Sequence, residues 1–95
     1  MARVTTAIVG CGVRTMTFHG PHTKKSDKYE LLAVCDVDAE RRAYASEKLG
    51  VRALADYRDV IALENVQSIM VVTTAQWHAQ IALDAIRAGK HVLVE

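Results

Sequence analysis

The sequence has little of what marks the more unusual classes of protein. Its 95 residues include one proline and two cysteines, and the formal net charge is only +1. Two cysteines are too few for a disulfide framework, so we expect a reducing, cytoplasmic location. A nearly neutral chain gives no electrostatic reason to bind nucleic acid or an anionic membrane, and we expect neither as a partner.

Long apolar runs are also missing. No stretch approaches the roughly 20 residues that cross a bilayer, and the opening MARVTTAIVG becomes polar too early for a signal peptide. With 51% apolar and 24% charged residues, the composition is that of an ordinary globular chain. A length of 95 residues allows one domain at most.

What the sequence does contain is a regular alternation of apolar runs and helical segments. Strands are expected over 4–9, 29–36, 51–54, 66–74 and 91–95. Helices are expected over 13–25, 38–49, 56–63 and 76–88. This alternation predicts parallel strands joined by right-handed crossovers. Because the first strand ends in a glycine turn, we expect an α/β, doubly wound Rossmann sheet of order 3-2-1-4-5.

Local signals mark several helix ends. Asp38 suits the N-cap of the second helix, and Gly50 stands where a C-cap glycine belongs. Gly20-Pro21 is expected to interrupt or kink the helix over 13–25. The helix over 76–88 is the clearest, with an apolar face at i, i+3, i+4 and i+7 formed by Ala79, Ala82, Leu83 and Ile86.

The first strand leads into VGCGVRT, residues 9–15. Gly10 permits a tight turn, and Gly12 lets a pyrophosphate approach the backbone at a helix N-terminus that favours anions. Thr15 stands where a third glycine would let the helix pack closely on the strand. Its hydroxyl therefore needs a partner, either a phosphate or a backbone carbonyl, or else the helix must stand off.

Asp36 follows the second strand, about 20 residues downstream of the glycines, where a dinucleotide-binding fingerprint has an acidic residue. A carboxylate there accepts hydrogen bonds from the adenosine ribose and repels a 2′-phosphate, which favours NAD. NADP remains an alternative because Arg14, Arg41 and Arg42 are candidates for a 2′-phosphate. Asp36 has a second interpretation as a turn carboxylate before Asp38.

Cysteines and histidines suggest further chemistry only weakly. Cys11 precedes a helix N-terminus, which lowers a thiol pKa, but a small side chain buried in the turn is the favoured interpretation. Cys35 is expected in the core. His19 and His22 lack a third ligand at a credible spacing, so we assign no metal site. Trp77 is expected to cover an apolar edge or to stack on the cofactor.

Four stretches, taken in order, resemble the N-terminal domain of oxidoreductases of the glucose–fructose oxidoreductase, inositol dehydrogenase and MocA type: VGCGVRTMTFHGP, LLAVCDVDAER, VVTTAQWHAQIALDAIRAGKHV and LVE. Phe18, His19 and Pro21 match the family's Phe-His-x-Pro. The family's Thr-Pro-Asn-x-x-His is matched only at its two ends, by Thr73 and His78, since Thr74 and Ala75 replace the proline and the asparagine.

The resemblance implies an NAD(P)-binding domain of a sugar or polyol oxidoreductase, over 1–95, which transfers a hydride at a secondary alcohol. In the family, Glu-Lys-Pro follows the fifth strand and its lysine is taken to be catalytic. We expect the chain to be truncated after that strand, at Glu95, without the lysine or the substrate domain, and to be inactive alone. We assign no catalytic residue.

Nine residues are expected at the cofactor, which is NAD or, as the alternative, NADP. Pyrophosphate would be held by Gly10, Gly12, Val13 and Arg14, and the adenosine ribose by Asp36. The resemblance adds Thr73, Thr74 and His78 along the crevice and Glu95 under the nicotinamide. His78 has a second interpretation, as a histidine in the first turn of its helix that bonds locally. A stand-alone nucleotide-binding or redox-sensing module without catalysis stays open. We also expect a homo-oligomer formed through the exposed strand 91–95.

Overall fold

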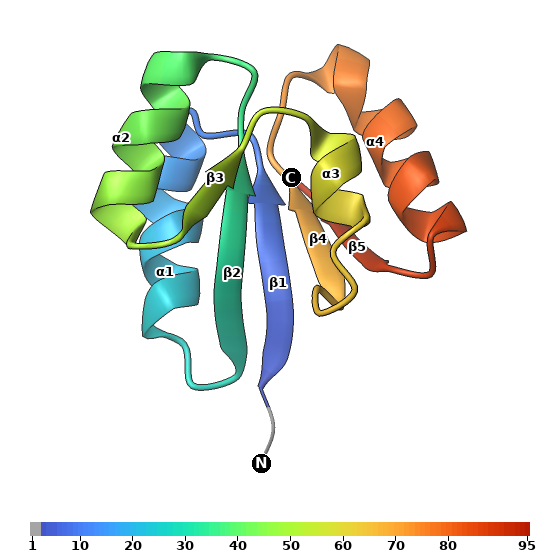
Figure 1. The fold of residues 1–95 in the computed structure, drawn as a ribbon, viewed down its shortest axis with the longest axis horizontal. Helices are drawn as coiled ribbons and strands as arrows, with labels where there is room; N and C mark the ends of the chain where they lie inside the picture. The colour runs from blue at the N-terminus through green and yellow to red at the C-terminus, as the bar shows by residue number, and fades with distance from the viewer. Residues whose placement is uncertain (1–2) are drawn as a thin grey trace.

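A parallel sheet with helices on both faces makes up the computed structural model, which describes residues 3–95 (Figure 1). The sheet has five strands in the order β3-β2-β1-β4-β5. The strands are β1 (Val4–Val9), β2 (Tyr29–Cys35), β3 (Arg52–Leu54), β4 (Ser68–Val71) and β5 (His91–Val94). The helices are α1 (Gly20–Lys25), α2 (Ala39–Leu49), α3 (Tyr57–Ile61) and α4 (Ala75–Arg87). The expected fold class and strand order are confirmed.

The two faces of the sheet carry separate apolar cores. In Figure 1, α1 and α2 lie on the left of the sheet, and α3 and α4 lie on the right. Ile8 and Val34 pack with Leu49 of α2 on the first face. Ala7 and Ile69 pack with Val60 of α3 and Ile81 of α4 on the second. Burial on both faces explains why the central strands read as continuous apolar runs.

The predicted caps of the second helix are confirmed. The Asp38 carboxylate accepts hydrogen bonds from the backbone N–H groups of Glu40 and Arg41, at 2.9 and 3.1 Å. Gly50 ends the helix in the left-handed conformation, with φ +66°. Both signals are local, because a cap depends on its own turn of backbone rather than on the rest of the fold.

The predicted strand over 66–74 is too long. β4 has four residues, Ser68–Val71. Val66 is buried, but its N–H donates to the Leu63 carbonyl in a turn, so its side chain joins the core without strand pairing. Beyond the strand, Thr74 is the N-cap of α4, and this leaves Thr73 and Thr74 in the loop at the carboxyl end of β4.

The helical backbone continues past Gly20-Pro21, and the expected interruption appears there as a change of helix type. Thr15–His19 forms a π-helical segment, η1, and the α-helix α1 begins at Gly20. Gly20 has helical dihedrals, φ −62° and ψ −57°, and Pro21 stands in the first turn of α1. A proline there has no N–H to donate to the preceding turn, and a widened turn accommodates that loss without a break.

The predicted face of α4 is wrong, although the helix itself is confirmed. Its buried residues are Ile81 and Ala85, whereas Leu83 and Ile86 are 46% and 59% exposed. The buried stripe keeps the helical period but is rotated about the axis, so the small Ala85 faces the sheet. Within residues 3–95, no helix is both long and apolar enough to cross a membrane.

Candidate functional site

The carboxyl ends of β1 and β4 meet where their following helices leave toward opposite faces of the sheet, and the glycine turn (residues 9–15) lies at this point. Gly10 has φ +110°, and a Cβ on it would lie 2.1 Å from the carbonyl oxygen of Val72. A Cβ on Gly12 would meet no atom within 4 Å. The turn is therefore packed tightly on one side and open on the other.

Thr15, which replaces the third glycine of the fingerprint, bonds the backbone through its hydroxyl. It donates a 2.5 Å hydrogen bond to the Gly10 carbonyl, and the side chain is fully buried. Its partner is thus the backbone of the turn. In the fingerprint, the third glycine lets the helix pack closely on its neighbour. Here Gly20 allows such close packing, because a Cβ on Gly20 would lie 2.9 Å from the Leu49 side chain of α2. The sequence pattern gave no sign of this contact.

The Asp36 carboxylate bridges the glycine turn and the loop after β2. Its Oδ2 accepts a 2.8 Å hydrogen bond from the Cys11 N–H, and its Oδ1 accepts one of 2.8 Å from the Asp38 N–H. The interpretation of Asp36 as a turn carboxylate before Asp38 is therefore confirmed. A carboxylate has about four acceptor positions, so each oxygen keeps capacity for a ribose hydroxyl.

Arginine 42, a candidate for a 2′-phosphate, is already engaged with backbone. Its Nη1 donates to the carbonyl oxygens of Asp36 and Val37, at 3.0 and 3.4 Å. Arg41 is exposed on the first turn of α2. Arg14 contacts Glu95 rather than the region of Asp36. Of the three arginines, Arg41 is the one whose side chain makes no hydrogen bond or ion pair within residues 3–95, so it stays a candidate for a 2′-phosphate.

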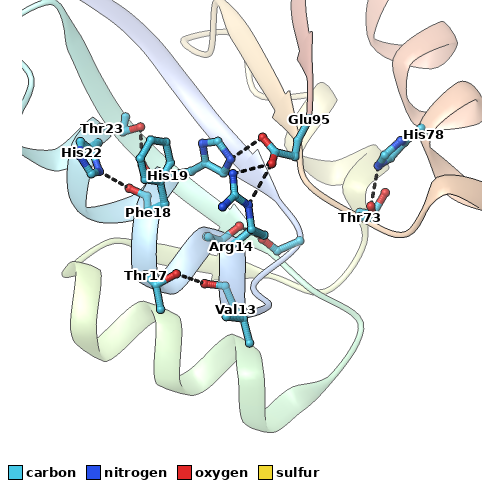
Figure 2. A network of polar contacts seen from close by, with 12 residues as sticks. Val13, Arg14, Thr17, Phe18, His19, His22, Thr23, Thr73, His78 and Glu95 are labelled. Carbon is cyan, nitrogen blue, oxygen red and sulfur yellow. Dashed lines mark hydrogen bonds and ion pairs between the residues drawn. The ribbon is translucent and has the colours of Figure 1, made fainter.

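Glu95 follows β5 and joins it to the first helical segment through Arg14 and His19 (Figure 2). Its Oε1 accepts from Arg14 Nε at 2.9 Å and lies 2.8 Å from Nη2. Its Oε2 lies 2.7 Å from His19 Nε2. The Arg14 guanidinium and, secondly, His19 lower the pKa of the Glu95 carboxyl. The sequence did not predict this contact.

Three expected crevice residues lie in the loop after β4 and the start of α4. His78 Nε2 is 2.5 Å from the Thr73 carbonyl oxygen, so its ring turns back on the loop (Figure 2). The Thr73 methyl would be 3.3 Å from a Cβ on Gly10, which places this loop against the glycine turn. Thr74 is exposed, and its side chain makes no capping hydrogen bond.

Both cysteines are buried thiols. Cys11 and Cys35 are 3% and 2% exposed, and Cys11 Sγ lies 3.4 Å from the Cys35 carbonyl oxygen. Burial, with the charge of Asp36 added, raises the pKa of the Cys11 thiol to about 12, and burial likewise raises that of Cys35 to about 12. The favoured interpretation of Cys11, a small side chain buried in the turn, is confirmed, and so is the core position of Cys35. The alternative of a lowered Cys11 pKa is wrong, because burial outweighs the helix N-terminus.

His19 and His22 turn to different partners. His22 Nδ1 is 2.7 Å from the Phe18 carbonyl oxygen, whereas His19 contacts Glu95 (Figure 2). Among residues 3–95, no group of three or more histidine, cysteine or acidic side chains is placed to hold a metal ion. Trp77, at the start of α4, is 52% exposed.

The expected site residues thus form two groups at the carboxyl ends of the strands. Gly10 packs closely against Thr73, and Asp36 is bonded to the Cys11 N–H of the same turn. Arg14 and Glu95 form the second group through their ion pair, and Val13, next to Arg14 in the chain, is 77% exposed. The first N–H groups of a helix have no intrahelical partner, and the neighbouring Gly12 has no atom within 4 Å of the position that a Cβ would take.

Comparison with known proteins gives the family. The oxidoreductase family of the Gfo/Idh/MocA type, described as having an NAD-binding Rossmann fold, matches residues 4–95. The chain belongs to this family. The resemblance expected from the four motifs is confirmed, and so is the class of cofactor, a nicotinamide dinucleotide.

The names of several relatives refer to reactions of sugars or polyols. A myo-inositol 2-dehydrogenase of Thermotoga maritima is 33% identical over 89 residues, which are 93% of this chain and 26% of that protein. A glycosyl hydrolase family 109 protein of a Shewanella strain is 30% identical, and the match covers 100% of this chain and 23% of that protein. The chain therefore spans about a quarter of the length of these relatives.

Solved structures share the fold. An NAD-binding protein from Listeria innocua superposes with a TM-score of 0.88 at 31% identity, over 98% of this chain and 27% of that one. A 3-ketoreductase from Actinomadura kijaniata, solved with NADP, has a TM-score of 0.92 at 24% identity, over 98% of this chain and 30% of that one. The second likeness bears on the fold alone.

Proposed function

We propose that the chain is the cofactor-binding domain of an oxidoreductase that moves a hydride between a nicotinamide dinucleotide and the secondary alcohol of a sugar or polyol. The observation that carries this proposal is the glycine turn, open at Gly12 and held to the Asp36 carboxylate through the Cys11 N–H. The dehydrogenase names of the relatives support the substrate class.

The proposed contacts are assigned to backbone and side-chain groups at the carboxyl ends of the strands. The backbone N–H groups of Gly12, Val13 and Arg14 would face the pyrophosphate, and Gly10 keeps the turn tight. Asp36 would accept from the adenosine ribose hydroxyls. Thr73, Thr74 and His78 would line the crevice, and Glu95 would lie beneath the nicotinamide. Nicotinamide supplies the hydride chemistry when it is bound, and the chain orients it.

NAD is the favoured form of the cofactor. The Asp36 carboxylate would repel a 2′-phosphate, and Arg42, which could offset that repulsion, donates to the Asp36 and Val37 carbonyls. Arg41 remains a candidate for NADP. We therefore expect NADH to bind more tightly than NADPH, with a preference that depends on the charge at residue 36.

The test is a titration with NADH and NADPH, followed by nicotinamide fluorescence. The unchanged protein should show saturable NADH binding. Asp36→Ala should weaken NADH binding, and Asp36→Asn should narrow the preference for NADH over NADPH while keeping an acceptor for the Cys11 N–H. Absence of saturable NADH binding by the unchanged protein would contradict the proposal. So would a ratio of the NADH and NADPH dissociation constants that neither variant changes.

We also propose that the chain alone binds cofactor without turnover, because none of its residues is assigned to proton transfer. NAD reduction by the chain in the presence of inositol or another polyol would refute this point. The non-catalytic alternative is a nucleotide-binding module. Its redox-sensing form is disfavoured, because the raised pKa values of Cys11 and Cys35 keep both thiols protonated near neutral pH.

A further inference from the structure

Glu95 has both carboxylate oxygens engaged by side chains of the helical segment that follows β1. Oε1 faces the Arg14 guanidinium and Oε2 faces His19 Nε2 (Figure 2). These contacts join residues 81 and 76 positions apart in the chain. A carboxylate held at both oxygens has one orientation, whereas an exposed glutamate normally samples several rotamers.

The two partners are themselves held in place. The Arg14 guanidinium carbon lies 5.4 Å from the centroid of the Phe18 ring, within the range of a cation–π contact. The His19 and Phe18 rings meet edge to face, with centroids 5.1 Å apart. The His19 side chain is only 13% exposed. Phe18 therefore limits the movement of both residues that hold Glu95.

The location of this network decides which half of a dinucleotide it can affect. Asp36 follows β2, on one side of the glycine turn, and Glu95 follows β5, two strands away on the other side. If Asp36 marks the adenosine half, a dinucleotide laid across the turn brings its nicotinamide half over β4 and β5, toward Glu95.

We propose that His19 and Arg14 are positioning residues that fix the Glu95 carboxylate at the carboxyl end of β5, beneath the nicotinamide half of the cofactor. This inference rests on the proposed function. It assigns the Arg14 side chain to Glu95 and leaves only its backbone N–H for the pyrophosphate. A competing role, in which the Arg14 guanidinium grips the diphosphate, makes a different prediction for ligands that lack nicotinamide.

NADH and ADP distinguish the two roles, because ADP has the adenosine and the diphosphate but no nicotinamide riboside. Calorimetry should give dissociation constants for both ligands at about 0.15 M ionic strength, where distant charges are screened. His19→Ala and Arg14→Ala should each weaken NADH binding by about three- to tenfold, as expected for a partly exposed contact to a charged group. ADP binding should change less than about twofold.

His19→Gln is the conservative variant, since its amide N–H can donate to Glu95 in place of the imidazole. It should restore most of the NADH affinity. His91→Ala is the matched control, because His91 is exposed at the opposite end of β5. His22 is less suitable, since its ring packs on Phe18 with centroids 4.3 Å apart. Thermal melts should accompany each titration.

The outcomes separate this inference from the proposed function. Equal weakening of NADH and ADP, or no change in either, overturns the positioning role while the unchanged protein still binds NADH. Failure of the unchanged protein to bind NADH overturns the proposed function, and the inference with it. If His19→Ala does not fold, Glu95→Gln replaces it, and a loss confined to NADH is again the supporting result.

Discussion

Thr15 and Gly10 are joined inside the glycine turn by a 2.5 Å hydrogen bond from the threonine hydroxyl to the glycine carbonyl oxygen. Thr15 is fully buried. The bond closes the turn internally, because the Thr15 side chain and Gly10 are both buried. The threonine at this position thus stabilises the turn by bonding its backbone.

Replacement of Thr15 by valine should destabilise the protein by about 1–3 kcal/mol, because the shape is kept while the buried Gly10 carbonyl loses its donor. Urea unfolding should show a lower midpoint at an unchanged slope. Thr15→Ser keeps the hydroxyl and should lose less. Thr15→Gly restores the glycine fingerprint, yet we expect it to be less stable than the natural protein. A Thr15→Val protein of unchanged stability would contradict the structural role of the bond.

Gly10 and Gly12 should respond in opposite ways to an added methyl group. Gly10→Ala should fail to fold stably, because φ is +110° and the Cβ would lie 2.1 Å from the Val72 carbonyl oxygen. Gly12→Ala should keep its melting temperature within about 2 °C, because its Cβ meets nothing within 4 Å. The same Cβ would stand on the open face and should weaken NADH binding at least about tenfold.

Melting temperatures and NADH titrations of the two variants check this contrast. Tight NADH binding by a folded Gly12→Ala protein would show that the cofactor does not approach the turn at this face. A Gly10→Ala protein as stable as the natural one would show that the turn can relax away from Val72.

The elements that the sequence predicts best are those fixed by local chemistry. Asp38 and Gly50 cap their helix through their own turns, so their roles follow from residue type. The rotation of α4 about its axis does not follow from residue type, because it depends on which side chains fit against the sheet. In α4, Ala85 is buried and Ile86 is exposed. An apolar pattern gives the period of a helix more firmly than its phase.

The long-range side-chain contacts in the site cannot be predicted from the sequence either. His19 and Glu95 are 76 residues apart, and nothing in either segment indicates the other. The sequence predicts Asp36 at the carboxyl end of the second strand, where the structure has it directly after β2, but its bond to the Cys11 N–H depends on the register of β1 against β2. Spacing predicts which strand ends meet, and side-chain packing then decides which groups touch.

The thiols of Cys11 and Cys35 should be unreactive in the native protein. Their pKa values of about 12, against an ordinary value of 9.0, reduce the thiolate fraction at pH 8 from about 10⁻¹ to about 10⁻⁴. Reaction with a disulfide reagent should therefore be slow at pH 8 and become fast in urea. Rapid labelling of the native protein would contradict the burial of both side chains.

The same shifts predict alkaline instability. A thiol whose pKa is higher in the folded than in the unfolded state contributes stability that is complete below pH 9 and is lost as the pH rises toward 12. The free energy of unfolding should therefore fall between these values. The Cys11→Ala, Cys35→Ala double variant is the control and should show a shallower decline, since both proteins share their tyrosines and lysines. An equal slope in the two proteins would refute the assignment.

The outer edge of β5 should promote self-association. β5 pairs with β4 on one side only within the described sheet, and Leu93 and Val94 are 59% and 45% exposed. An open edge with apolar side chains favours pairing with a second chain, and a lysine at the edge opposes it. Leu93→Lys should thus lower the apparent mass measured by light scattering at high micromolar concentration. Val37→Lys removes another exposed apolar side chain, far from β5, and should have no effect. If the unchanged chain is monomeric under these conditions, the prediction is wrong. If Leu93→Lys and Val37→Lys lower the apparent mass equally, the association is due to exposed apolar side chains in general and not to the edge of β5.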